Sequence, residues 1–167
     1  MKTPVSTQVA PVAFASAALF ALLNVGLGAA PRARWVQYVG LGSHALLLPL
    51  AARLAAPAWA RALGYAWVAI DDAASVAVLR GNTPESVMPV RLGGHVLAAA
   101  WLASASQALP TPVRWLGRVA AACLGGNSLV APFTKGKPPV LLYAAGPLLV
   151  GWFAAVGVAS QRAARPE

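Results

Sequence analysis

Residues 9–29 read VAPVAFASAALFALLNVGLGA, a run of 21 positions with no charged side chain and one amide, Asn24. An apolar run of about 20 residues is long enough to cross the hydrocarbon core of a bilayer as a helix. It exceeds the roughly 7–15 residues of a signal-peptide apolar region, and Pro31 would follow the cleavage position. We therefore expect a retained transmembrane helix here.

The composition of the whole chain agrees with a membrane location. Hydrophobic residues make up 59% of the 167 positions, charged residues 10%, and the mean hydropathy is +0.66. Average soluble proteins have roughly 45–50% and about 25%. A soluble fold of this length could not bury so much apolar surface. We expect an integral membrane protein of a bacterial inner membrane.

Proline, glycine and arginine divide the chain into six apolar runs. Gly81 opens what we expect to be the longest loop. The fold class predicted is all-α: a polytopic helical bundle of six transmembrane helices with short loops, one domain over residues 1–167. The spans are 9–29, 36–54, 62–79, 91–109, 113–133 and 140–160.

Small residues spaced four apart predict helix contacts, because they let backbones approach closely in lipid. Gly117, Ala121 and Gly125 form such a row in the fifth span. An alanine-rich chain also produces these spacings by chance, so the rows in the other spans carry less weight.

The net charge of +9 comes from 13 Lys and Arg, which lie singly or in pairs at the ends of the runs. Such positions anchor helices and meet anionic headgroups, and no basic stripe with interleaved aromatics is present, which argues against nucleic acid. The expected partners are membrane lipids, a small amphiphilic ligand, and copies of this chain or a larger membrane complex. Basic residues nearly balance between the two sides, and the basic C-terminal tail favours both termini in the cytoplasm.

Polar side chains gather at one depth. At 1.5 Å per residue, those in the spans lie roughly 5–12 Å below one face, the outward leaflet in this topology. We expect them to form a pocket for a ligand or ion beside the third loop. Its candidate residues are Asn24, His44, Asp71, Asp72, Ser75, Arg80, Arg91, His95, Asn127 and Tyr143.

Asp71 and Asp72 are the strongest single signal. Neighbouring residues on a helix point about 100° apart, so both cannot enter one narrow seam. Carboxylates in hydrocarbon are costly and usually face protein or water. A functional carboxylate for protons, cations or substrate is favoured over a structural one paired to Arg80, Arg91 or a histidine.

Two histidines, His44 and His95, lie on parallel spans at similar depth. Haem between them, or a metal ion with Asp71 or Asp72, is less favoured than hydrogen bonds across helix seams. The cofactor stays unknown, no metal ligand set is assigned, and the single Cys123 permits no disulfide within the chain.

The function follows less directly than the fold. No phosphate-binding loop, nucleophile elbow, zinc pair or dinucleotide fingerprint is present, and catalytic residues stay unknown. Binding or transport of a small molecule or ion by the pocket ranks first. A membrane enzyme acting on a lipid or isoprenoid-like amphiphile follows closely, and an accessory subunit of a larger membrane complex is the third alternative.

Overall fold

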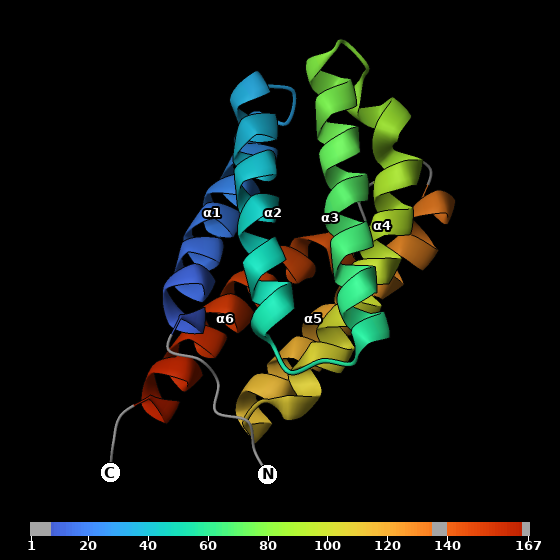
Figure 1. Cartoon of the computed structure of the whole chain (residues 1–167). Coiled ribbons are helices and arrows are strands. Elements are labelled where there is room, and N and C mark those ends of the chain that lie inside the picture. Colours follow the sequence, from blue (N-terminus) through green and yellow to red (C-terminus); the bar gives the residue numbers. More distant parts are fainter. Residues whose placement is uncertain (1–7, 135–139, 165–167) are drawn as a thin grey trace.

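The computed structural model describes residues 8–134 and 140–164, and these residues are helical with short connections. Figure 1 shows the helices in chain order. Two 3₁₀ turns extend the ends of α4 and α5. The elements are α1 (Val9–Ala29), α2 (Arg34–Arg53), α3 (Ala58–Leu79), α4 (Pro84–Ala105), η1 (Ser106–Ala108), α5 (Thr111–Val130), η2 (Ala131–Phe133) and α6 (Val140–Ala163).

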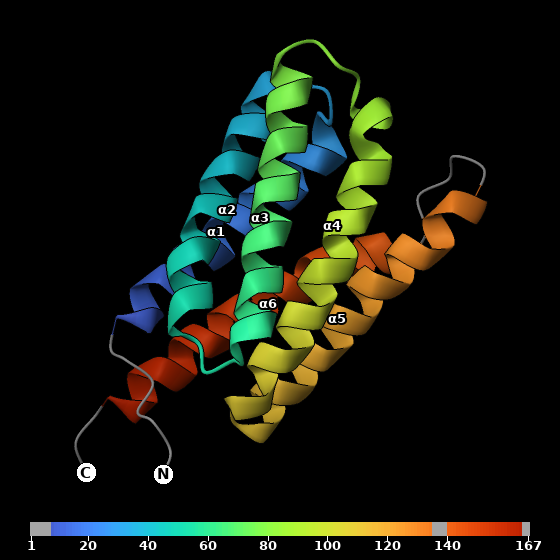
Figure 2. The same ribbon diagram turned by 45° about the vertical axis from the view of Figure 1, so that its right-hand side comes forward.

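The helices form a closed ring. Each helix packs against its neighbours in the chain, and α1 packs against α6. In both views α2 and α3 run side by side, while α5 and α6 cross them obliquely (Figures 1 and 2). Among the described residues no other pair of long helices makes extensive contact. The interior therefore faces all six helices.

The bounds of the helices lie within four residues of the predicted spans, except at the start of α4. Residues from 84 onward were expected in the longest loop, but α4 begins at Pro84. Thr83 caps this helix, because its Oγ1 accepts the backbone N–H of Ser86 at 3.2 Å. Proline in the first turn and the acidic Glu85 complete a helix start. The loop is therefore short, and α4 extends toward that face.

Three of the helices, α1, α3 and α6, are long and apolar enough to cross a membrane by the described residues. The six-span bundle expected from the sequence is therefore supported in part. Basic and polar side chains lower the hydropathy of the other three helices, for example Arg91 and His95 in α4 and Arg114 and Arg118 in α5.

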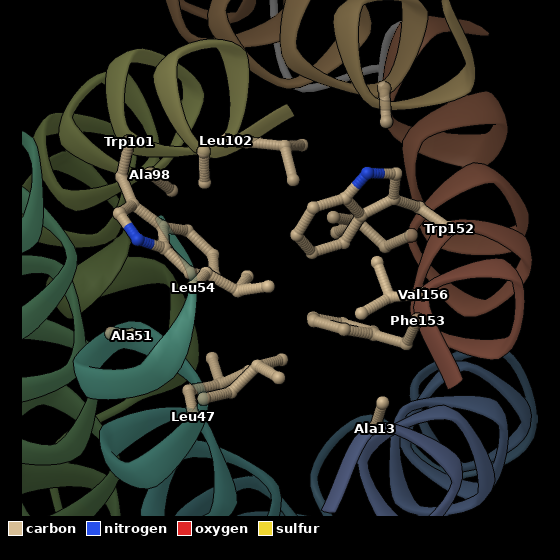
Figure 3. Close-up of a cluster of buried hydrophobic side chains, with 14 of the residues drawn as sticks. Ala13, Leu47, Ala51, Leu54, Ala98, Trp101, Leu102, Trp152, Phe153 and Val156 are labelled. Carbon is tan, nitrogen blue, oxygen red and sulfur yellow. The ribbon is translucent and has the colours of Figure 1, made fainter. Parts of the chain in front are cut away.

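One half of the ring's interior is filled by apolar side chains (Figure 3). Trp101, Trp152 and Phe153 are the largest buried groups there. Small residues admit the indoles: a Cβ at Gly64 would lie 2.9 Å from the Trp101 ring, and one at Gly117 would collide with Trp152. The close approach predicted for Gly117 is thus present, toward α6 and η1.

Aromatic rings form a closed circuit where this apolar half begins. Neighbouring centroids lie 5.1–6.0 Å apart, and the members come from five helices. We call it the aromatic circuit. Its members are Phe20, His44, Trp67, Trp101, Trp152 and Phe153.

Candidate functional site

A cavity of about 610 Å³ lies in the other half of the helix ring. It is lined by the C-terminal parts of α1, α3 and α5 and by the N-terminal parts of α2, α4 and α6. Its size is within the roughly 300–1,000 Å³ of small-molecule sites. Leu27, Leu142 and Tyr143 line it and are exposed, so the cavity reaches the surface beside them. We call this the central cavity, since residues of all six helices line it.

Asp71 lies at the inner end of the central cavity and is 2% exposed. Its Oδ2 accepts a hydrogen bond of 2.7 Å from Trp67 Nε1, one helical turn earlier. The Nε2 atoms of His44 and His95 lie 3.6 and 3.7 Å from the same oxygen. Its Oδ1 has no hydrogen-bond partner in the described chain. One oxygen of a buried carboxylate is therefore left open.

Asp72 faces another direction, as expected for a neighbour on a helix. Its side chain is 32% exposed, and its Oδ1 lies 3.0 Å from His44 Nδ1. It does not line the central cavity. His44 thus lies between two carboxylates, one on each ring nitrogen, and the Asp72 contact fixes the orientation of the imidazole. A neutral imidazole donates to only one of them, and donation to both requires the protonated ring.

Arg91 enters the central cavity from α4, one turn from His95 toward the surface. It donates from one terminal nitrogen to Gln37 Oε1 at 2.9 Å and to Ser75 Oγ at 3.0 Å. Both acceptors are neutral, and no carboxylate of the described chain pairs with the guanidinium. The cavity therefore holds a positive group near its opening and a negative group deeper.

Further polar atoms of the lining lack partners. Asn127 is 1% exposed and its Oδ1 has no hydrogen bond, and the same holds for His95 Nδ1. Unsatisfied buried polar groups typically cost about 1–3 kcal/mol each. Their position around a cavity gives a reason for them: a bound molecule or water could supply the missing bonds.

Most candidates from the sequence do line the central cavity. Only Asp72, which contacts His44, and Arg80, exposed at the end of α3, lie outside it. The cavity-lining candidates are Asn24, His44, Asp71, Ser75, Arg91, His95, Asn127 and Tyr143.

Two further side chains contact the candidate residues and were not predicted from the sequence: Gln37, which contacts Arg91, and Trp67, which contacts Asp71. Gln37 is 5% exposed although it lies close to the start of α2, and Trp67 resembles an ordinary core aromatic. A position four residues before Asp71 is one turn away on the same helix face, which was the available signal for Trp67.

The described residues contain no group of three or more His, Cys, Asp or Glu side chains arranged to hold a metal ion. The chemistry that the lining does offer is charge recognition and proton exchange between carboxylate and imidazole.

Comparison with protein-family models, with curated proteins and with solved structures finds no match to this chain.

Proposed function

We propose that this chain is an integral membrane protein of six spans whose central cavity binds a small amphiphilic molecule. The observation that carries the proposal is Asp71: a carboxylate that is buried, bonded through one oxygen only, and turned toward a cavity of ligand size. Charged groups at such depth are functional by default in membrane proteins.

The distribution of side chains supports six spans. Each helix has 20–24 residues, or about 30–36 Å at 1.5 Å per residue. The helices of lower hydropathy turn His44, Arg91 and Asn127 inward, whereas their outer faces expose residues such as Leu48 and Val119. Exposed apolar side chains on every helix suit contact with lipid.

Tryptophans at the helix ends also favour a membrane. Trp35 lies in the first turn of α2, and Trp59 and Trp115 lie in the first two turns of α3 and α5 at the opposite end of the bundle. All are exposed. Amphipathic rings at both ends of a bundle are typical of the two membrane interfaces.

Binding is favoured over transport by the same geometry. The central cavity ends at the aromatic circuit, and the apolar core lies beyond it. A continuous polar path to the other face is not formed by the described residues. In the proposed site Asp71 and Asn127 accept hydrogen bonds from the ligand, Arg91 attracts a negative or strongly polar group, and the leucines contact its apolar part.

An enzyme acting on the bound amphiphile is the second candidate. The favouring observation is His95, whose Nε2 lies 3.7 Å from Asp71 and whose Nδ1 is unpartnered beside the cavity. An imidazole held by a carboxylate is suited to general acid–base catalysis. If the chain is such an enzyme, the molecule that co-purifies with it is a substrate. The wild-type protein then converts this substrate, whereas His95→Gln binds it without conversion.

Native mass spectrometry of protein released gently from membranes tests the binding proposal. The expected result is an adduct of a few hundred daltons on the wild type that is lost in Asp71→Asn. Loss of a charge-assisted hydrogen bond worth about 1.5–3 kcal/mol weakens binding roughly 10- to 150-fold. Glu85→Gln is the matched control, because Glu85 is an exposed carboxylate near the same face.

Folding of the variants is checked by thermal unfolding in detergent. An adduct that Asp71→Asn retains as well as the wild type would refute binding through Asp71. A stoichiometric complex with other subunits, unchanged by the substitution and free of small adducts, would instead make this chain a structural component of a larger assembly.

A further inference from the structure

We propose that the central cavity selects an amphiphile with a zwitterionic end: a phosphate or carboxylate at Arg91 and a primary ammonium at Asp71. This inference rests on the proposed binding function and names the class of ligand. It is carried by the two opposite charges in the lining and by the hydrogen bonds that each still lacks.

Arg91 offers unused N–H donors to an anion. Both of its hydrogen bonds leave from one terminal nitrogen, toward Gln37 and Ser75. The other terminal nitrogen and Nε have no hydrogen bond within the described chain. Each of these N–H groups can donate to an oxygen of a carboxylate or phosphate, and the bond is strengthened by the opposite charges. The bonds to α2 and α3 hold the guanidinium in place, so its remaining donors are oriented before a ligand arrives.

Asp71 and Asn127 offer acceptors at the inner end. Asp71 Oδ1 and Asn127 Oδ1 are buried and unpartnered, and both residues line the cavity. Only a donor satisfies them, and an ammonium group carries three N–H donors together with the charge that Asp71 balances. A quaternary ammonium has no N–H to donate, so a primary ammonium fits this lining better.

The two subsites are spaced for one molecule. Ser75, which accepts from Arg91, lies four residues and hence about 6 Å along α3 from Asp71. No ion pair of 4 Å or less joins Arg91 to Asp71, so neither charge neutralises the other. An anion and an ammonium separated by a few bonds, as in phosphoethanolamine or an ω-amino acid, bridge this spacing.

The remaining lining is apolar and favours a hydrocarbon part on the same molecule. Leucines from four helices lie in the wall, and Leu27 and Leu142 lie where the cavity reaches the surface. A monoacyl lipid headgroup and a free amphiphilic zwitterion share this chemistry. The leucines of the lining are Leu23, Leu27, Leu92, Leu124, Leu142 and Leu149.

The test is a titration of the full chain from which the co-purifying molecule has been removed. Native mass spectrometry measures the binding of each added probe. Monoacyl phosphoethanolamine is compared with monoacyl phosphocholine of the same acyl chain, which differs by three methyl groups. Monoacyl phosphate carries the anion alone and dodecylamine the cation alone. 6-Aminohexanoate represents a free zwitterion without a lipid chain.

The expected result is that a primary-ammonium zwitterion binds at least about tenfold more tightly than the N-methylated and single-charge probes. Preference for the monoacyl lipid identifies a headgroup site, and preference for 6-aminohexanoate identifies a free solute. Arg91→Gln and Asp71→Asn each reduce this preference. Arg91→Lys keeps the charge but loses the planar set of N–H donors, and recovers only part of the affinity. Arg80→Gln leaves the preference unchanged, because Arg80 is a basic residue that lies outside the cavity.

Equal binding of the phosphoethanolamine and phosphocholine probes, or binding of a single-charge probe that Arg91→Gln does not affect, would overturn the zwitterion inference. So would the absence of binding by every probe. In each case the native adduct and its dependence on Asp71 decide the proposed function separately, because that measurement assumes no ligand class. Variants that fail to fold are replaced by Ser75→Ala, which removes one of the bonds that orient the Arg91 guanidinium.

Discussion

Replacing Gly117 with alanine should destabilise the bundle, although alanine is the better helix former. Gly117 lies inside α5, where η1 and α6 approach its backbone. A Cβ at this position would overlap Ser106 Oγ and lie 2.5 and 2.9 Å from Nε1 and Cδ1 of Trp152. Such distances are shorter than packed side chains tolerate, so one of the two neighbours has to shift.

Neither neighbour can shift easily. Ser106 Oγ donates a hydrogen bond of 2.7 Å to the Leu102 carbonyl, and the Trp152 side chain is 0% exposed and enclosed by the apolar core. Overpacking of this kind costs about 1–3 kcal/mol. The gain in helix propensity from glycine to alanine is at most about 1 kcal/mol. We expect a net loss of up to about 2 kcal/mol in the free energy of unfolding, and a loss of about 1–3 kcal/mol relative to a glycine-to-alanine change that meets no neighbour.

The assay is equilibrium unfolding in mixed micelles with increasing SDS, followed by tryptophan fluorescence. Gly93→Ala is the matched control: Gly93 lies inside α4, and a Cβ there would have no neighbour within 4 Å. It should be unchanged or slightly stabilised. Ser106→Ala combined with Gly117→Ala removes one collision and should recover part of the loss. Equal stability of Gly117→Ala and Gly93→Ala would refute the packing described for α5.

Three further perturbations address other contacts. Trp67→Phe keeps an aromatic ring but removes the donor to Asp71 (2.7 Å) and should lower the unfolding free energy by about 1–3 kcal/mol; an unchanged SDS midpoint would contradict this bond. Thr83→Ala removes the cap of α4 and should cost about 1 kcal/mol in the same assay, whereas Thr83→Ser should cost little. The pKa of Glu85 is lowered below 4.5 by its own backbone N–H and by Arg32, so its contribution to stability is present above pH 4.5 and is lost as the pH falls below that value. Glu85→Gln should remove that part of the pH dependence of the SDS midpoint between pH 5 and 3, and an identical pH profile in the variant would contradict it.

The helices could largely be predicted, because the length of an apolar run indicates the length of the helix that it forms. The predicted span 9–29 coincides with α1. The start of α4 differs from the prediction for a local reason: Thr83, Pro84 and Glu85 are residue types that also occur in loops, and here they form a cap and first turn. Whether α2, α4 and α5 cross a membrane stays a prediction, because their inward polar groups lower the hydropathy on which length-based recognition depends.

The level of a residue along the bundle could also be predicted, but its direction around a helix could not. Counting residues put His44, Asp71 and His95 at one level, and the structure joins them around one carboxylate oxygen. The same count cannot separate Asp71 from Asp72, because two adjacent residues share a depth and only packing decides which faces inward. Partners on other helices, such as Gln37 for Arg91, depend on the arrangement of the ring and carry no local signal.

The ring of helices has a consequence for the order in which the protein is made. Five of its contacts join helices that follow each other in the chain, whereas the sixth joins α1 to α6. During synthesis α1 leaves the ribosome first and waits for α6, which is completed last. Until then the ring is open, and the wall contributed by Tyr143 and Gly146 is missing from the cavity. The central cavity is therefore completed only when α6 packs against α1, although most of its polar lining residues lie on the helices before α6.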